Sequence, residues 1–497
     1  VKDNMTLKAK WLLENAYIKS RTASENEKLI GLDFTNQTRL SSGLISVKFT
    51  YPINKIIVGA TKPTKNIAKE ADLSVDKDGS VKAYIVKSGT NYDLLIAAED
   101  TRTIINLPSN SSYLFANIYA DSITFNSNVN AKTVTDMSYM FVSSAMTINL
   151  KNLDTSNVTN MEGMFKKEDK LINESTGEIE YGMYAGKARE KITRFYNNNY
   201  YDHNGNSIRT INGLSDLNVS KVTNMSYMFE NSAYTQINLS KWNTSKVTNM
   251  ESMFSGTYAD SSNLNGLKTS NVVNMKNMFS GSNLISTAVA SFDTSKVTNM
   301  SGIFSEITIS QLNLSKWKTS NVTDMSGMFF GAKIDSIIGL NNFNTSRVTD
   351  MSYIFGRIDF NGKNLDLSSW NTSNVTNMSS MFYNVTINQL DLSSWNTSKV
   401  ADMSNMFSSI KANSIVGLKD FNTSKVTNMK EMFGVTDSID GYSRFTEIDN
   451  LDISSWDTSK VTDMSGMFAY GKFKEMRLTN FKATKLTNAE SIFEGLT

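Results

Sequence analysis

Residues 365–382 read Leu-Asp-Leu-Ser-Ser-Trp-Asn-Thr-Ser-Asn-Val-Thr-Asn-Met-Ser-Ser-Met-Phe, and much of the chain repeats this phrase with variations. Most copies start 25 to 27 residues apart, and a decayed copy begins at Leu486. A fixed period of this size is typical of solenoids, in which each repeat contacts only its neighbours. The sequence therefore predicts a solenoid of about 13 repeats. The first Val of the Val-Thr-Asn/Asp-Met-x-x-Met-Phe core lies at Val134, Val158, Val222, Val247, Val272, Val297, Val322, Val348, Val375, Val400, Val426 and Val461.

Within each repeat, the apolar residues first recur at every second position and then at the three- and four-residue spacing of a helix. Leu365 and Leu367 alternate with polar residues, which predicts a half-buried strand. The polar link after the strand predicts a turn, and its Thr-Asn pair could cap a helix. Met378, Met381 and Phe382 follow at positions that would share one face of a short helix or 3₁₀ turn. We therefore expect strand, turn, short helix and return loop in every repeat.

Two sets of apolar positions are candidates for the core. The Met-Phe layer recurs in nearly every copy, and Met fills irregular gaps well. The position five residues before the repeat Val holds Trp, Phe or Leu, and this tolerance favours a buried stripe over an exposed sugar-stacking platform. That position is occupied by Leu153, Leu217, Trp242, Leu267, Phe292, Trp317, Phe343, Trp370, Trp395, Phe421, Trp456 and Phe481.

The chain before the repeats differs in composition. Residues 80–87, 92–98 and 103–107 read as short strands joined by turn residues. We expect residues 12–110 to be a linker and a β-rich N-terminal capping region, because an open sheet edge invites unwanted pairing. Residues 111–497 then hold the repeats, with insertions at 166–210 and 434–449.

The phrase at 365–382 resembles the 26-residue bacterial surface protein repeat family, relatives of the BspA-like leucine-rich repeat surface proteins. The resemblance implies an α/β repeat fold: a leucine-rich-repeat-like right-handed solenoid with one parallel sheet and short helices. It also implies secretion, attachment to a bacterial cell surface or cell wall, and a role in adhesion. In addition, Asp3-Asn-Met-Thr-Leu-Lys-Ala-Lys-Trp11 resembles the last strand of an internalin-type B-repeat, so residues 1–11 are interpreted as the tail of a preceding β-grasp-like repeat.

Composition excludes several function classes. The chain has 50 Lys and Arg against 48 Asp and Glu, and it contains no run of five like charges, which argues against a nucleic-acid partner. It has no Cys and a single histidine, His203, so thiolate chemistry and a multi-histidine metal site are not expected. No apolar stretch is long enough to cross a bilayer. We expect no cofactor and no catalysis.

The two insertions carry the candidate binding residues. Repeat consensus supports stacking, whereas binding specificity usually lies on loops, and Tyr and Arg are enriched at binding hot spots. A second possibility is the outward Asn, Asp and Ser ladder of the strands, although we favour a solvated sheet surface as the explanation of that ladder. The candidates in the insertions are Tyr181, Tyr184, Arg189, Arg194, Tyr196, Tyr200, Tyr201, Tyr442, Arg444 and Phe445.

The sequence-level hypothesis is a non-catalytic adhesin or binding protein of the bacterial cell surface. Its partner would be a host or bacterial surface protein or glycan, and we expect the protein to act outside the cell as a monomer. A passive spacer is the first alternative, although a spacer needs no aromatic insertions. A polysaccharide-active solenoid enzyme is the second, and it would need a carboxylate cluster that departs from the consensus. Because the chain starts at Val1 and ends within a repeat-like phrase, we expect it to be a fragment.

Overall fold

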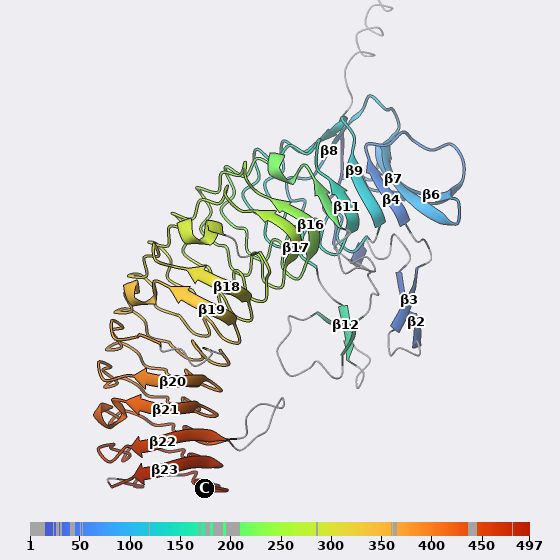
Figure 1. Ribbon diagram of the computed structural model, residues 1–497. Helices are drawn as coiled ribbons and strands as arrows, with labels where there is room; N and C mark the ends of the chain where they lie inside the picture. Colours follow the sequence, from blue (N-terminus) through green and yellow to red (C-terminus); the bar gives the residue numbers. More distant parts are fainter. Residues whose placement is uncertain are drawn as a thin grey trace, which may run out of the picture. The chain divides into compact units, whose positions relative to one another are not determined.

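In the computed structural model the chain forms two compact units. Figure 1 shows its strands coloured along the sequence. Unit 1 comprises Val1–Val247 with Thr257–Leu267, and unit 2 comprises Thr248–Gly256 with Lys268–Thr497. The structure describes residues 15–22, 24–25, 29, 32–39, 45–49, 51, 53–118, 120–167, 170–173, 179–181, 192–194, 209–284, 287–358, 360, 365–435, 445–479 and 481–497.

Unit 1 contains a seven-stranded mixed sheet in the order β15-β11-β9-β4-β7-β6-β5. The strands β5, β6 and β7 form an antiparallel meander, and the others pair in parallel. Strand β4, from the region before the repeats, therefore pairs directly with β9, so this edge of the repeat strands is covered. The bounds are β4 (Ile53–Val58), β5 (Ile67–Asp72), β6 (Val81–Ser88), β7 (Asn91–Ala98), β9 (Ala120–Phe125), β11 (Ala145–Asn149) and β15 (Thr210–Asn212).

Four smaller sheets and one 3₁₀ helix are also found among the described residues of unit 1. Strands β1 (Asn15–Tyr17), β8 (Ile104–Asn106) and β10 (Val129–Asn130) form a parallel sheet, and β16 (Ala233–Asn238) pairs in parallel with β17 (Tyr258–Asn263). Strands β2 (Leu32–Arg39) and β3 (Ile45–Phe49) are antiparallel, as are β12 (Lys170–Asn173), β13 (Ile179–Tyr181) and β14 (Ile192–Arg194). One 3₁₀ helix, η1, spans Leu214–Asp216.

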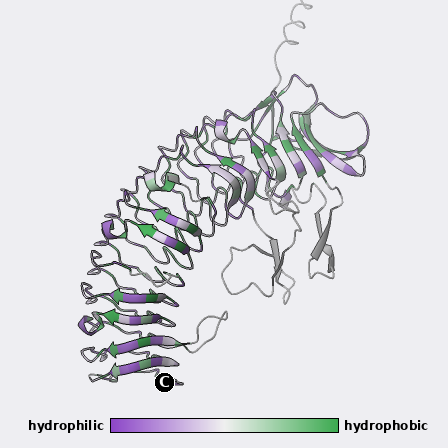
Figure 2. Cartoon of the chain, viewed as in Figure 1, coloured by the Kyte–Doolittle hydropathy of each residue, from purple (hydrophilic) through white to green (hydrophobic). Residues whose placement is uncertain are grey.

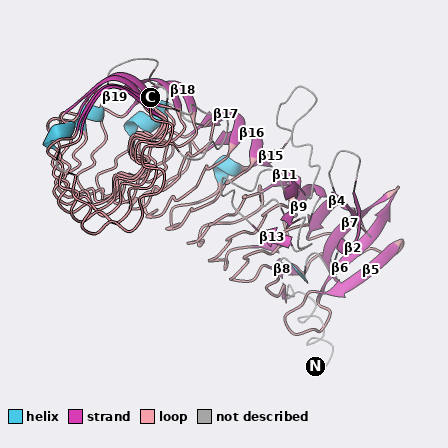
Figure 3. Cartoon of the chain, turned by 90° about the horizontal axis from the view of Figure 1, so that it is seen from below, coloured by secondary structure: helices cyan, strands magenta, loops and turns pink. Residues whose placement is uncertain are grey.

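Unit 2 consists of repeats whose strands pair in parallel with the strand of the next copy. Strands β18 (Thr308–Asn313) and β19 (Lys333–Ile338) form one sheet, and β20 (Thr386–Asp391), β21 (Lys411–Val416), β22 (Thr446–Asp452) and β23 (Gly471–Arg477) form another. Three 3₁₀ helices lie in this unit: η2 (Thr287–Ser291), η3 (Leu340–Asn342) and η4 (Leu418–Asp420). In Figure 3 the strands β18 and β19 each lie on the same side of their repeat, and turns and loops form the other sides.

The Met-Phe segment is not helical, and its backbone hydrogen bonds give the reason. The N–H groups of Met378, Ser380 and Phe382 donate to carbonyls one repeat further on, over 3.0, 2.8 and 2.9 Å. Ser380 also has a φ of 56°, which is left-handed. An α-helix needs right-handed φ throughout and bonds each N–H within itself. The segment is therefore a series of turns whose alternate amides join neighbouring repeats.

The expected fold, a leucine-rich-repeat-like right-handed solenoid with one parallel sheet and short helices, is wrong. The described repeats form several separate sheets, and their helical residues are confined to the 3₁₀ turns η1 to η4. The sheets of unit 2 are separate because some copies do not form a full strand. The copy before Phe292 carries η2, and the copy at Leu365 makes only one bridge, to Leu390.

The predicted core is confirmed. In each full copy the repeat Val, the two Met or Ile positions and the Phe are at most 3% exposed, and the Trp/Phe/Leu stripe is buried from Leu153 to Trp456. Four Trp indoles donate Nε1 to a carbonyl of the preceding repeat: Trp242, Trp317, Trp370 and Trp456. Figure 2 shows strands with hydrophobic and hydrophilic residues in alternation, as expected of half-buried sheets.

Candidate binding surface

The outward face of the repeat strands carries paired polar side chains. Asp391 alternates with the buried Leu390 and Leu392, and its Oδ1 accepts bonds from the Ser393 hydroxyl at 2.7 Å and the Ser393 N–H at 2.9 Å. The same Asp-Ser pairing occurs at Asp366–Ser368 and Asp452–Ser454. Within this ladder, the carboxylates are already held by their own repeats.

These hydrogen bonds also set the charge state of the ladder. The serine hydroxyl, followed by the serine backbone N–H, lowers the pKa of Asp366, Asp391 and Asp452 below the usual aspartate value. Hydrogen bonds to the charged form of a carboxylate favour that form. The outward ladder is therefore anionic at neutral pH.

The face of β22 and β23 adds ion pairs and one exposed aromatic ring. Lys472 Nζ lies 3.5 Å from the Glu447 carboxylate and 4.0 Å from the centre of the Phe445 ring. Phe445 is 37% exposed, although it is a large apolar residue. A cation over an aromatic face is attracted to the ring electrons. Phe445 is thus held on the surface, immediately after the segment 436–444 that lies outside the described residues.

The insertion 166–210 is described only in part. Tyr181 ends β13 and Arg194 ends β14, and these strands flank β12 on its two sides, with Tyr181 opposite Lys170 and Arg194 opposite Leu171. Only the backbone of these two candidates is described. The remaining candidates, and His203, lie outside the described residues: Tyr184, Arg189, Tyr196, Tyr200, Tyr201, Tyr442 and Arg444.

Sequence reasoning included Phe445 but missed Lys472. The two residues lie 27 positions apart, and no local motif connects them. The parallel pairing of Glu447 with Lys472 brings them together. The usable signal is the repeat period, which aligns Lys472 with the residues just after Phe445.

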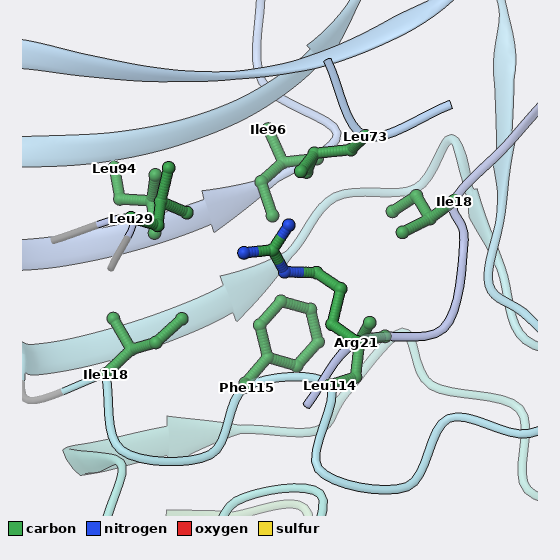
Figure 4. Close-up of a pocket in the computed structure, with 9 residues that line it drawn as sticks. All are labelled: Ile18, Arg21, Leu29, Leu73, Leu94, Ile96, Leu114, Phe115 and Ile118. Carbon is green, nitrogen blue, oxygen red and sulfur yellow. The ribbon is translucent and has the colours of Figure 1, made fainter. Parts of the chain in front are cut away.

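Unit 1 contains a small internal cavity around Arg21 (Figure 4). Ile18, Leu73, Ile96 and Phe115 are among the apolar side chains that surround the guanidinium. This burial lowers the pKa of Arg21, and the nearby Glu25 carboxylate opposes the shift. With a volume of about 10 Å³, the cavity has room for about one water molecule. It is too small for a ligand.

Within the part of the chain that the structure describes, no three His, Cys, Asp or Glu side chains gather closely enough to hold a metal ion. Nor does any helix there have the length and apolar character needed to cross a membrane.

The repeats match a known protein family along most of the chain. The model of DUF285, described as a Mycoplasma protein of unknown function, matches residues 102–182, 195–315, 256–357, 304–417, 333–444 and 390–497. The chain belongs to DUF285. No curated protein and no solved structure matches it. The overlapping matches follow the repeats, so DUF285 here is a repeat family, and the finer resemblance to BspA-like surface proteins is carried by the residues alone.

Proposed function

We propose that this DUF285 chain is a non-catalytic binding protein of the bacterial cell surface that adheres to host or neighbouring-cell macromolecules. The observation that carries the proposal is the exposed Phe445 ring, held by Lys472 at the end of a segment that departs from the repeat consensus. Aromatic residues are enriched at interfaces relative to the rest of the surface, and the lysine fixes this ring in an exposed position. Surface location rests on the resemblance of the repeat phrase to BspA-like surface proteins.

The distribution of apolar residues supports binding over a purely structural role. The Met, Phe and Trp of the full repeats are buried, whereas Phe445 is one of several large apolar side chains exposed among the described residues. Single exposed apolar residues are ordinary, so Phe445 is informative because a cation lies over its ring. Phe445 lies at a sequence-unique segment, and a passive spacer has no need of it.

A binding array tests the proposal. The intact chain is applied to immobilised glycans and host surface proteins, and every positive is measured again with the double variant Phe445→Ala/Lys472→Ala. We expect at least one ligand whose affinity falls tenfold or more in this variant. The matched control is Asp366→Ala/Asp391→Ala, which alters the same kind of outward face away from Phe445, and we expect it to bind normally.

Two outcomes would contradict the proposal. Absence of any binder on the array would favour the spacer role. A loss of binding in the aspartate control but not in the Phe445 variant would move the receptor surface to the Asp-Ser ladder. Circular dichroism melts of both variants show whether each is folded.

A further inference from the structure

Unit 2 carries a row of cations that the sequence does not display as a charge run. The residue immediately before the repeat Val, or before Leu486 in the decayed copy, is a Lys in four consecutive copies: Lys399, Lys425, Lys460 and Lys485. All four are exposed. We call them the basic row. Their separations of 25 to 35 residues along the chain hide the row from any search for adjacent charges.

Backbone pairing fixes the spacing of the row. Three residues after each Lys, a parallel bridge links Asp402 to Asn428, Asn428 to Asp463 and Asp463 to Asn488. Parallel neighbours lie ~4.8 Å apart. The backbones from which the four ammonium groups extend therefore follow one line at about one charge per repeat.

Most of the ammonium groups of the basic row have no partner among the described residues. Among the described residues, Lys425, Lys460 and Lys485 have no carboxylate within 4.0 Å and no side-chain hydrogen bond, while Lys399 donates to Asn374 at 2.5 Å. Asp457 carries an opposite charge beside Lys460: its pKa is lowered first by the Ser459 hydroxyl and then by smaller contributions that include Lys482 and Lys460. One carboxylate does not cancel the row.

The aspartates three residues after Lys399 and Lys460 are hydrogen-bonded within the protein. Asp402 and Asp463 are half-buried. Their Oδ1 atoms accept from the serine two residues later, and their Oδ2 atoms accept from Asn428 and Asn488 at 3.2 and 3.3 Å. These carboxylates help to fix the turns, and both of their oxygens already have donors.

A second row, of threonine hydroxyls, runs beside the basic row. Thr427, Thr462 and Thr487 are exposed, and each hydroxyl donates to a carbonyl of the preceding repeat at 3.2, 3.0 and 2.9 Å. Their hydrogens are therefore used, whereas each oxygen keeps lone pairs that can accept a hydrogen bond. A ligand that fits both rows carries anions and donates hydroxyl groups.

We propose that the basic row and the adjacent threonines bind an extended acidic polysaccharide. Its sulfate or carboxylate groups would pair with the lysines, and its hydroxyls would donate to the threonine oxygens. A single-stranded nucleic acid fits less well, because such proteins stack bases on aromatic side chains, and neither row contains an aromatic residue. This site is separate from Phe445 and does not depend on the adhesive role proposed above.

The test uses the intact chain and four probes: dextran sulfate, polygalacturonate, uncharged dextran and an oligothymidine. Titration calorimetry should show binding of at least one of the two acidic polymers, and comparison of the two tells sulfate from carboxylate recognition. We expect Lys425→Gln/Lys460→Gln/Lys485→Gln to weaken that binding at least tenfold. The slope of log Kd against log salt should become shallower by on the order of one per lost contact. The charge-preserving triple variant to Arg should bind nearly as well as the parent.

The matched control is Lys316→Gln/Lys333→Gln/Lys430→Gln, which changes net charge equally at lysines outside the row. It should keep the parent affinity, and Phe445→Ala/Lys472→Ala should also keep it. Equal losses in the two Gln triples, no effect of the row variant, or tighter binding to oligothymidine than to both acidic polymers would each overturn the proposal. So would an absence of binding to both acidic polymers.

Discussion

Phe382 stacks on Phe407 of the next repeat with ring centres 5.7 Å apart and an angle of 5° between the planes, and the Phe382 N–H donates to Met406 at 2.9 Å. Side chain and backbone thus join the same two repeats at the same place. The stacking continues to Phe433 and Phe468 with separations of 5.4 and 5.9 Å. Offset aromatic pairs at such distances contribute beyond their buried area. Cohesion between copies therefore depends on the turn segment as well as on the strands.

Met378→Asp tests the buried layer. Met378 is fully buried, so an aspartate there would be an unpaired charge in the core and should cost several kcal/mol, about 3–5, in unfolding free energy. Ala401→Asp, at an exposed position of the next repeat whose side chain makes no hydrogen bond, should change it by less than about 0.5 kcal/mol. Urea unfolding followed by circular dichroism measures both. Equal midpoints for the two variants would show that the layer is not part of the core.

The left-handed turn position gives a second prediction. Gly327 has a φ of 59°, and a Cβ added there would meet no atom closer than 3.8 Å. Gly327→Ala should therefore cost only the left-handed backbone penalty of roughly 1–2 kcal/mol. Gly417→Ala should cost more, because Gly417 also has a left-handed φ of 92° and its added Cβ would lie 2.5 Å from the backbone nitrogen of Ser393, which cannot move aside. The two unfolding midpoints decide the order, and an unchanged Gly417→Ala midpoint would contradict the turn geometry.

Variants of two tryptophans in adjacent repeats can distinguish the contribution of a hydrogen bond from that of packing. Trp370 Nε1 donates to Leu340 at 3.1 Å, whereas Trp395 Nε1 is buried and finds no acceptor among the described residues. Replacement by Phe removes the same volume at both sites. Trp370→Phe should be more destabilising than Trp395→Phe by about 1 kcal/mol or more, since only the former breaks a bond. Denaturant titrations that gave the reverse order would rule this out.

Part of this architecture could be predicted from the sequence and part could not. Burial of Met378 and Phe382 follows from their recurrence, and the alternation of Leu390 with Asp391 correctly indicates a strand. The turn geometry could not be inferred, because spacings of three and four residues fit a helix as well as a series of turns. What decides is where the Ser380 N–H bonds, and that acceptor lies in another repeat.

The candidate surfaces show the same limit. Phe445 was found because it interrupts the consensus, but Lys472 is an ordinary strand residue until pairing brings it over the ring. The basic row was missed for a related reason: its members are never adjacent in sequence. Both features are products of repeat register, so they become visible only when copies are aligned in space.

Acid should destabilise the protein in a defined window. The folded-state pKa values of Asp366, Asp391 and Asp452 lie below the unfolded value, which is about 3.9 for aspartate. These carboxylates therefore stabilise the fold above that pH, and the contribution is lost as pH falls through the folded-state pKa values. Urea midpoints should be flat from neutral pH to about pH 5 and should then fall. The triple Asp→Asn variant should show a shallower fall, and a slope identical to that of the parent would refute the assignment.

Removal of the first insertion should separate stability from binding. The copies on either side of it are joined directly: Gly163 N–H donates to Ser226 at 2.8 Å, Phe165 N–H donates to Met228 at 2.9 Å, and the rings of Phe165 and Phe229 lie 5.5 Å apart. None of these bonds uses residues 168–208. Replacing those residues by a short Gly-Ser link should therefore leave the melting temperature within about 3 °C of the parent, because repeats contact their nearest neighbours. The same variant should lose affinity for ligands found on the binding array, since the Tyr and Arg candidates are removed with the insertion. The control keeps the length of the parent chain but has the residues of the insertion in scrambled order. Should the shortened chain melt much earlier, the insertion is part of the fold, and should it bind every ligand normally, the receptor surface lies elsewhere on the repeats.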